Sequence, residues 1–289
     1  LFNWNKDMRQ LIALFIMGSF IFYSCDTSGA LKKEVKPKKE DKVEHIEKSE
    51  LDEERPVADE KKLDNGIIIR WFEHGSGAQV KDGNLLEIDY KVLLKDRTVV
   101  DGNHLLKMES MPFMVGFNMQ TKGWDIALRE LKVGDFAEII IPSDLARGSK
   151  GIAGLIPPNA DNILKIKILS NKKPTREVDG NKVWVFEENQ KNKVVFDEGR
   201  QIEFHCMTST PSTPFYVNTY RLNEPFKLRL EDSGVVPGLK KALINAKKSD
   251  RMFVLVPSSE AYGAKGYLNI VKPNEALFYN ILVMDVTKD

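Results

Sequence analysis

The stretch Gly148-Ser149-Lys150-Gly151, followed closely by Leu155-Ile156-Pro157-Pro158-Asn159, decides the fold because the chain contains a second version of it. That version is Gly263-Ala264-Lys265-Gly266, followed by Ile270-Val271-Lys272-Pro273-Asn274. The two versions lie 115 residues apart (263 − 148). This period is far longer than the 20–50 residues of solenoids and propellers.

Other pairs of motifs share the same offset. Gly123-Trp124 corresponds to Gly238-Leu239, and Ile141-Pro142 corresponds to Val256-Pro257. One offset across several separate motifs is hard to obtain by chance. The pattern therefore predicts that one domain of roughly 100 residues is used twice.

The composition limits the remaining possibilities. A chain of 289 residues has room for two ordinary domains and additional segments. The formal net charge is +1, and acidic and basic residues are interspersed, so we expect no nucleic-acid partner. The two cysteines, Cys25 and Cys206, form no disulfide framework, and the four histidines lack the spacing that zinc requires. The sequence predicts no metal site and no cofactor.

The amino-terminal residues have the pattern of a secretory signal. Lys6 and Arg9 precede an apolar run over residues 11–22, which ends at Tyr23-Ser24-Cys25. The alternative is a transmembrane helix, which needs about 20 apolar residues, so the signal is favoured. Met8 would be a more ordinary first residue than Leu1.

Residues 22–25 resemble a bacterial lipobox, although lipoboxes usually have leucine where Phe22 stands. The resemblance implies that residues 1–25 are a lipoprotein signal peptide and that Cys25 becomes the lipidated first residue. Residues 26–63 follow as a tether, and nearly two thirds of residues 31–62 are charged. This composition predicts a solvated, disordered spacer that holds the folded part away from a membrane. The alternative is a charged amphipathic helix over residues 42–54.

The first repeat, over residues 64–172, reads mainly as strands. Apolar and polar residues alternate over 86–94, and residues 136–141 and 163–169 are further apolar runs. The one helical pattern covers residues 123–131 and ends before the turn signal Val133-Gly134-Asp135. Many strands with one short helix predict an α+β domain with the helix packed on an antiparallel sheet.

The second repeat, over residues 181–289, has the same order. Ile202, Phe204 and Cys206 alternate with polar residues, Pro237 precedes a helix over 238–246, and strands follow over 251–256 and 276–286. Cys206 is expected to be a small buried residue. The polar segment 174–180 is predicted to link the two domains, which we expect to fold separately.

These motifs resemble the FKBP-type peptidyl-prolyl isomerase domain over residues 66–170 and 183–286. In the first repeat they are Tyr90, Val100-Asp101, Pro112-Phe113, Gly123-Trp124, Val133-Gly134, Ile141-Pro142, Gly148 and Leu155-Ile156-Pro157-Pro158-Asn159. In the second repeat they are Pro225-Phe226, Val235-Val236, Pro237-Gly238, Ala261-Tyr262-Gly263-Ala264-Lys265-Gly266 and Pro273-Asn274.

The resemblance implies a sheet of five antiparallel strands wrapped on a short helix, with a shallow apolar pocket between them that takes a proline ring. In the first repeat it implies the site residues Tyr90, Val100, Asp101, Phe113, Trp124, Ile156 and Leu164. In the second repeat it implies Phe226, Val235, Val236, Tyr262, Val271 and Tyr279.

Each repeat departs from the family pattern at different positions. The first has Gln120 and Thr121 where the family has an apolar pair, and Arg147 where the family has a tyrosine that donates a hydrogen bond to ligand. The second has Leu239 where the family has the tryptophan of the pocket floor, and Cys206 where it has its first tyrosine. It also lacks an acid equivalent to Asp101. The first repeat is expected to be the better catalyst because it keeps Trp124, Tyr90 and Asp101 together.

The reaction that the resemblance implies needs no nucleophile and no metal. Rotation about an X–Pro bond has a barrier of about 20 kcal/mol, and an enzyme accelerates it by binding the twisted amide better than the planar forms. The expected function is a prolyl isomerase that helps exported proteins to fold. The alternative is a degenerate FKBP-like module that binds a client without turnover or acts as a chaperone subunit of a membrane-associated complex.

The expected partners are proline-containing polypeptides and a membrane reached through the lipid anchor, with an outer-membrane protein complex as a further candidate. The expected location is the bacterial cell envelope, with the outer membrane favoured.

Overall fold

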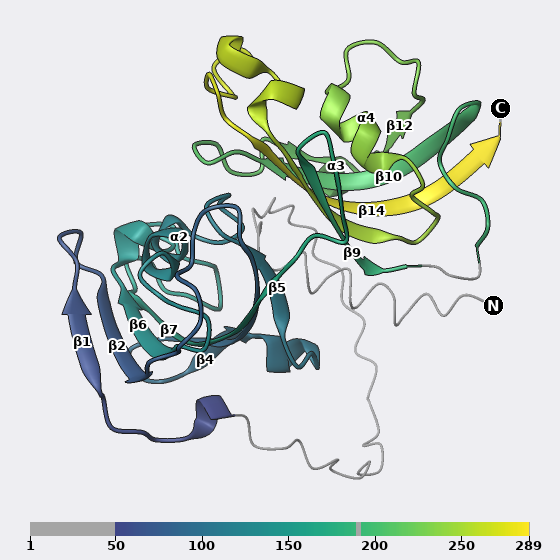
Figure 1. Cartoon of the computed structure of the whole chain (residues 1–289). Helices are drawn as coiled ribbons and strands as arrows, with labels where there is room; N and C mark the ends of the chain where they lie inside the picture. The colour runs from purple at the N-terminus through teal and green to yellow at the C-terminus, as the bar shows by residue number, and fades with distance from the viewer. Residues whose placement is uncertain (1–49, 189–191, 289) are drawn as a thin grey trace, which may run out of the picture.

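The computed structural model describes residues 50–188 and 192–288, which form two domains (Figure 1). The predicted signal peptide, Cys25 and the first part of the predicted tether lie outside these residues. Within the described ranges, no helix has the length and apolar character that crossing a membrane requires.

Domain 1 is built on one antiparallel sheet, in which the strands lie in the order β1-β2-β6-β7-β3-β4 and β5 also pairs with β3. The strands are β1 (Asp59–Lys62), β2 (Ile68–Glu73), β3 (Leu85–Leu93), β4 (Val99–Gly102), β5 (Met111–Met114), β6 (Phe136–Ile141) and β7 (Asn162–Lys172). The α-helix is α2 (Lys122–Leu128), and the 3₁₀ turns are η1 (Glu50–Asp52), η2 (Asn103–Leu106) and η3 (Ser143–Leu145).

Domain 2 has the same strand order, because β8-β9-β13-β14-β10-β11 corresponds element by element to domain 1 and β12 pairs with β10 as β5 pairs with β3. The strands are β8 (Arg176–Val178), β9 (Asn181–Glu187), β10 (Arg200–Ser209), β11 (Val217–Asn218), β12 (Phe226–Leu228), β13 (Arg251–Val256) and β14 (Leu277–Lys288). The helices are α3 (Thr219–Leu222), α4 (Pro237–Leu243), η4 (Ser258–Glu260) and η5 (Gly263–Lys265).

Glycine lets each helix approach its sheet closely. A Cβ atom on Gly123 would lie 2.3 Å from Cγ2 of Ile141, and one on Gly238 would lie 2.5 Å from Cγ1 of Val256. Real Cβ atoms do not approach other atoms so closely, so a larger residue would push the helix away from the sheet. This contact explains why glycine stands at both positions of the repeat.

The structure differs from the prediction at both ends of domain 1. Residues 50–62 belong to the predicted tether, yet β1 pairs with β2 and Leu51 is buried. Residues 176–178 belong to the predicted linker, yet they form β8 and pair with β9. In both places a polar, exposed strand gains its order from hydrogen bonds to a neighbouring apolar strand. The helices are also shorter than predicted, because α2 ends at Leu128 and α4 ends at Leu243.

The outer face of the domain 2 sheet packs on domain 1. Trp184, Phe253 and Phe278 belong to the same buried cluster as Phe117, whose ring centroid lies 5.9 Å from that of Phe278. Two polar side chains also cross the junction. The Ser209 hydroxyl donates to the Phe117 carbonyl at 2.6 Å, and Asn118 Nδ2 donates to the Thr210 carbonyl at 2.8 Å.

Candidate binding pockets

The aromatic floor of domain 1 is centred on Trp124, in the first turn of α2. Its ring stacks on Phe113 at a centroid distance of 5.4 Å and meets the edge of Tyr90 at 5.2 Å. Tyr90, Phe113 and Trp124 are all buried, on β3, β5 and α2. Leu164 and Ile156 are also buried in this cluster. Three elements therefore converge on one rigid aromatic group.

Asp101, at the end of β4, lies beside this group. Its carboxylate accepts hydrogen bonds from the Gly102 backbone N–H at 2.8 Å and from the Tyr90 hydroxyl at 3.2 Å. Burial raises the pKa of the Asp101 carboxyl, while these hydrogen bonds and the Arg147 charge oppose the rise. Burial and the Asp101 charge raise the pKa of Tyr90. The phenol therefore stays protonated and serves as a donor.

The cavity next to Asp101 is small, with a free volume of about 20 Å³. Arg147 forms part of its wall and donates from Nη2 to Gln120 Oε1 at 2.8 Å. Burial lowers the pKa of the Arg147 guanidinium, and the Asp101 charge opposes this effect. The lining residues are Val92, Val100, Asp101, Gln120, Thr121, Trp124, Arg147, Ile152, Leu155, Ile156 and Asn162.

The equivalent pocket of domain 2 is wider and less polar, with a free volume of about 230 Å³. Leu239 of α4 stands at the position that Trp124 holds in domain 1, and a smaller side chain leaves more room. The lining residues are Phe204, Thr208, Tyr216, Val217, Phe226, Lys227, Leu228, Gly234, Val235, Val236, Leu239, Tyr262 and Tyr279.

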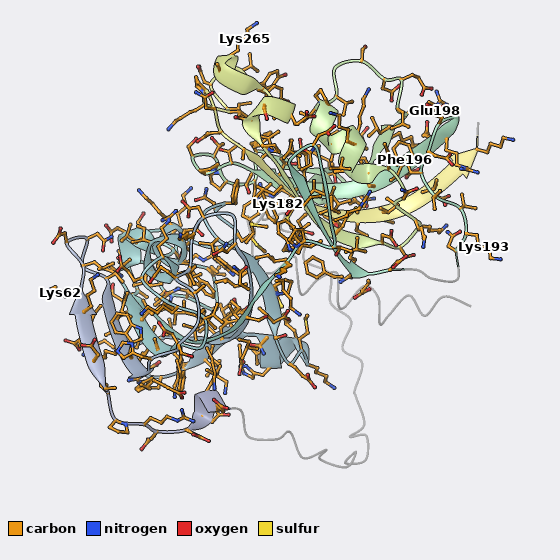
Figure 2. The ribbon with its side chains drawn as sticks, in the orientation of Figure 1. Lys62, Lys182, Lys193, Phe196, Glu198 and Lys265 are labelled. Carbon is orange, nitrogen blue, oxygen red and sulfur yellow. The ribbon has the colours of Figure 1, made fainter. Side chains whose placement is uncertain are left out.

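Tyr262 gives this pocket a hydrogen-bond donor. It precedes η5, and its ring stacks on Tyr267 at a centroid distance of 4.7 Å. Burial raises the pKa of Tyr262, which keeps the hydroxyl protonated. Figure 2 shows Lys265 of the same loop at the outer tip of domain 2, pointing away from the body of the protein. The Tyr262 loop therefore lies at an accessible end of the domain.

Cys206 lies in the core behind the pocket. The side chain is buried on β10, and its sulfur lies 3.8 Å from the Thr208 hydroxyl, which the structure leaves as either donor or acceptor. Burial raises the pKa of the Cys206 thiol to about 12. The sulfur is therefore a protonated packing group at neutral pH and not a nucleophile.

The structure brings most of the predicted residues to the two pockets. In domain 1, Asp101, Trp124 and Ile156 line the cavity, while Tyr90 and Phe113 pack behind Trp124. The predicted domain 2 residues that line the pocket are Phe226, Val235, Val236, Tyr262 and Tyr279. Val271 does not line it but lies buried in the adjoining core and bridges to Tyr267.

Sequence reasoning missed several lining residues. In domain 1 the polar Asn162 is the main omission. In domain 2 the missed residues are Phe204, Thr208, Tyr216, Val217, Lys227, Leu228 and Gly234. The alternation along residues 202–206 continues to Thr208, so that position could have been found. Asn162 precedes an apolar run and gives only the signal of a turn residue.

Comparison with known proteins places these pockets in a family. The statistical description of the family "FKBP-type peptidyl-prolyl cis-trans isomerase" matches residues 76–169 and 192–284. FK506-binding protein 1 of Eremothecium gossypii is 36% identical over 110 residues, which cover 37% of this chain and 94% of that protein. Human peptidyl-prolyl cis-trans isomerase FKBP10 is 23% identical over 227 residues, which cover 78% of this chain but 38% of that protein. The chain thus spans well under half the length of that relative.

Among solved structures, the three FKBP domains of wheat FKBP73 share 22% identity with this chain. The match covers 78% of this chain and 97% of that one, with a TM-score of 0.39. The two family matches together cover more than half of the chain, one in each domain. The chain therefore belongs to the FKBP-type peptidyl-prolyl cis-trans isomerase family and carries two domains of it in tandem.

Proposed function

We propose that this protein is a peptidyl-prolyl isomerase whose working site is the pocket of domain 2. The observation that carries the proposal is the difference in the free volume of the two pockets, which is about 230 Å³ in domain 2 and about 20 Å³ in domain 1. A proline ring needs an apolar pocket that it can enter, and valines, Phe226 and Leu239 line the domain 2 pocket. The sequence had favoured domain 1 for its tryptophan and acid.

Rotation about an X–Pro bond is favoured by a pocket with apolar walls and one hydrogen-bond donor. Twisting the X–Pro amide removes its resonance, so the carbonyl oxygen sheds charge and favours a drier surrounding than water. Only a preference for the twisted form accelerates the rotation. The valine, phenylalanine and tyrosine walls supply this surrounding, and the Tyr262 hydroxyl can donate one hydrogen bond that orients the peptide.

An isomerisation assay on the full chain with a proline-containing test peptide tests this assignment. We expect Tyr262→Phe to lower kcat/KM by up to about tenfold, because one hydrogen bond is worth about 0.5–1.5 kcal/mol. Phe226→Ala should lower it as well by removing part of the apolar wall. Ser149→Ala, at an exposed position of domain 1, serves as the control. If activity survives both domain 2 changes but is lost in Asp101→Ala and Phe113→Ala, the working site is in domain 1.

A second candidate is a binding module without turnover. Leu239 favours it, since the pocket lacks the flat aromatic floor that Trp124 gives domain 1. The same peptides distinguish the two functions. A binding module would bind the proline peptide, and Tyr262→Phe would weaken that binding, while the wild-type chain would leave the rate of isomerisation unchanged.

We further propose that a lipid on Cys25 anchors the protein in a bacterial envelope membrane, where it acts on exported proteins. The signal pattern over residues 1–25 and the Ser24-Cys25 junction support this proposal. Each buried CH₂ contributes about 0.8 kcal/mol, so several acyl chains give a stable anchor. Cys25→Ser should move the protein out of the membrane fraction. Retention of that variant with an uncleaved signal would instead indicate a transmembrane anchor.

A further inference from the structure

The domain 1 pocket is polar at four positions where domain 2 is apolar or aromatic. All four pairs follow the offset of 115 residues that relates the two repeats (238 − 123). The pairs are Gln120 with Val235, Thr121 with Val236, Arg147 with Tyr262, and Asn162 with Leu277. The four domain 1 residues line one cavity, so the change in polarity is collective and not scattered.

The hydrogen bond from Arg147 fixes the orientation of Gln120. A guanidinium can only donate, so the atom that accepts from Arg147 at 2.8 Å must be the Gln120 carbonyl oxygen. The Gln120 Nε2 group is then the free end, and it is buried without a partner among the described residues. Gln120 is only 8% exposed. The pocket therefore contains an unused N–H donor.

Two more buried atoms of the same cavity lack partners within the described part of the chain. They are Asn162 Oδ1, on a side chain that is 4% exposed, and the Thr121 hydroxyl. Buried polar groups are almost always hydrogen-bonded in folded proteins, to protein, ligand or ordered water. A donor, an acceptor and a hydroxyl left unpaired around one cavity indicate an occupant that has both a donor and an acceptor.

The charges around the cavity select among possible occupants. A carboxylate would meet Asp101 and Asn162 Oδ1, and an ammonium group would meet Arg147 while leaving the Gln120 donor unused. A proline ring offers no N–H that could donate to Asn162 Oδ1. A primary carboxamide is planar, neutral and small, and it carries a carbonyl acceptor beside an NH₂ donor.

We propose that the domain 1 pocket binds the side-chain carboxamide of a glutamine or asparagine in an extended polypeptide, independently of proline. The carbonyl oxygen accepts from Gln120 Nε2 and the Thr121 hydroxyl, and the NH₂ group donates to Asn162 Oδ1. The indole of Trp124 lies beneath the group. The proposal rests on the proposed function in one respect, namely that the ligand is a polypeptide.

The test measures binding of proline-free, fluorescein-labelled pentapeptides to the full chain by fluorescence polarisation. The central residue is Gln, Glu or Met, and the carboxyl terminus is an N-methylamide, so the Gln peptide contains the only primary carboxamide. We expect the Gln peptide to bind at least about tenfold tighter than either of the others, which corresponds to about 1.4 kcal/mol. Equal binding of the three peptides, or none up to millimolar concentration, would overturn the proposal and leave water as the partner of these atoms.

Two variants locate the site. Gln120→Glu keeps an acceptor for Arg147 but replaces the free donor with an acceptor, so the preference for Gln should disappear. Asn162→Leu takes the residue of domain 2 and should also abolish it. Because this substitution removes an unpaired buried polar atom, the thermal unfolding temperature of the Asn162→Leu variant should equal or exceed that of the wild type. A preference for Gln that survives both variants would place its binding elsewhere and overturn the proposal.

Tyr262→Phe separates this proposal from the proposed function. It should lower the rate of isomerisation and leave binding of the Gln peptide unchanged, whereas Asn162→Leu should abolish the preference for the Gln peptide. If Tyr262→Phe leaves isomerisation intact while Asn162→Leu abolishes Gln binding, the assignment of catalysis to domain 2 is wrong and the carboxamide site stands.

Discussion

The two pockets of this chain lie in the same fold, but their walls differ in polarity and charge. Both lie between a short helix and an antiparallel sheet with the same strand order, and both helices approach the sheet through a glycine. In domain 1 the floor is Trp124 and the wall carries Arg147 and Asp101. In domain 2 the floor is Leu239 and the wall carries Tyr262 with aliphatic residues. A shared fold therefore does not imply a shared ligand, even within one chain.

The two pockets differ in free volume and in the charged residues that line them. The larger floor and the guanidinium leave about 20 Å³ in domain 1, while domain 2 keeps about 230 Å³. Domain 1 places a carboxylate and a cation beside its cavity, whereas the lining of domain 2 includes one charged residue, Lys227, which is exposed. A twisted amide that favours dry surroundings fits domain 2, and a neutral polar group fits domain 1.

The largest expected effect is the loss of stability when the floor residues Trp124 and Leu239 are each replaced by alanine. Trp124→Ala should destabilise the protein by about 3–5 kcal/mol, because it removes a buried ring that packs against two aromatic neighbours. Leu239→Ala should lower the free energy of unfolding by about 2 kcal/mol. This value is at the low end for a buried Leu→Ala substitution, because one side of Leu239 already faces an open pocket. Urea unfolding of the full chain measures both. An equal or greater loss in Leu239→Ala would show that the domain 2 pocket is not open in solution.

Exchanging the wall residues tests the comparison more directly. In a Tyr262→Phe background, Arg147→Tyr should remove the positive charge from the domain 1 pocket and give it a phenol donor. We expect isomerisation to rise by a few-fold and less than about tenfold, because Gln120 and Thr121 keep the wall polar and the new donor adds about one hydrogen bond. The assay is the rate of isomerisation of the proline peptide. A fall in the rate would mean that Arg147 itself acts on the substrate and that domain 1 is the working site.

The repeat made the fold predictable, and the strands β3, β6, β7, β10, β13 and β14 were predicted from apolar alternation and apolar runs. Strand β13 was predicted with the bounds that it has in the structure. The helix α2 ends earlier than its periodicity suggested, because the backbone from Glu130 onward bonds back three residues and closes a turn. The strands β1 and β8 were missed, since their polar sequences resemble loops and their order comes from pairing with β2 and β9. The strands β2, β4, β5, β9, β11 and β12 were not predicted either.

The pockets were predictable only in part. A comparison with the family pattern identified Gln120, Thr121 and Arg147 as departures, but it could not say which atoms would remain unpaired. That depends on the Arg147 bond to Gln120 and on the packing around Asn162, which no local pattern encodes. The room in each pocket depends in the same way on three-dimensional packing, so the sequence favoured the domain with more family residues and not the one with more space.

Domain 2 has Cys206 on β10 where domain 1 has Tyr90 on β3. This exchange gives a smaller difference between the domains, in how stability depends on pH. Burial raises the pKa of the Cys206 thiol from 9.0 to about 12. The folded state therefore binds more protons than the unfolded state between these values, and stability falls as the pH rises above 9. Between pH 8 and pH 10 the wild type should lose about 1.4 kcal/mol more than Cys206→Ala does. Urea unfolding at the two pH values measures this loss, and parallel losses in both proteins would show that the thiol is not buried in solution.

The smallest expected effect concerns the link between the pockets. The Ser209 hydroxyl donates to the Phe117 carbonyl at 2.6 Å, and Ser209 is buried. Phe117 lies three residues before Gln120 of one pocket, and Ser209 follows Thr208 of the other. Ser209→Ala would leave the carbonyl unpaired, so it should cost about 1 kcal/mol in urea unfolding. Ser212→Ala is the matched control, because its hydroxyl bonds Glu275 at an exposed site within domain 2, and it should change stability by less than about 0.5 kcal/mol. If the two variants were equally stable, this hydrogen bond would not contribute to holding the domains together.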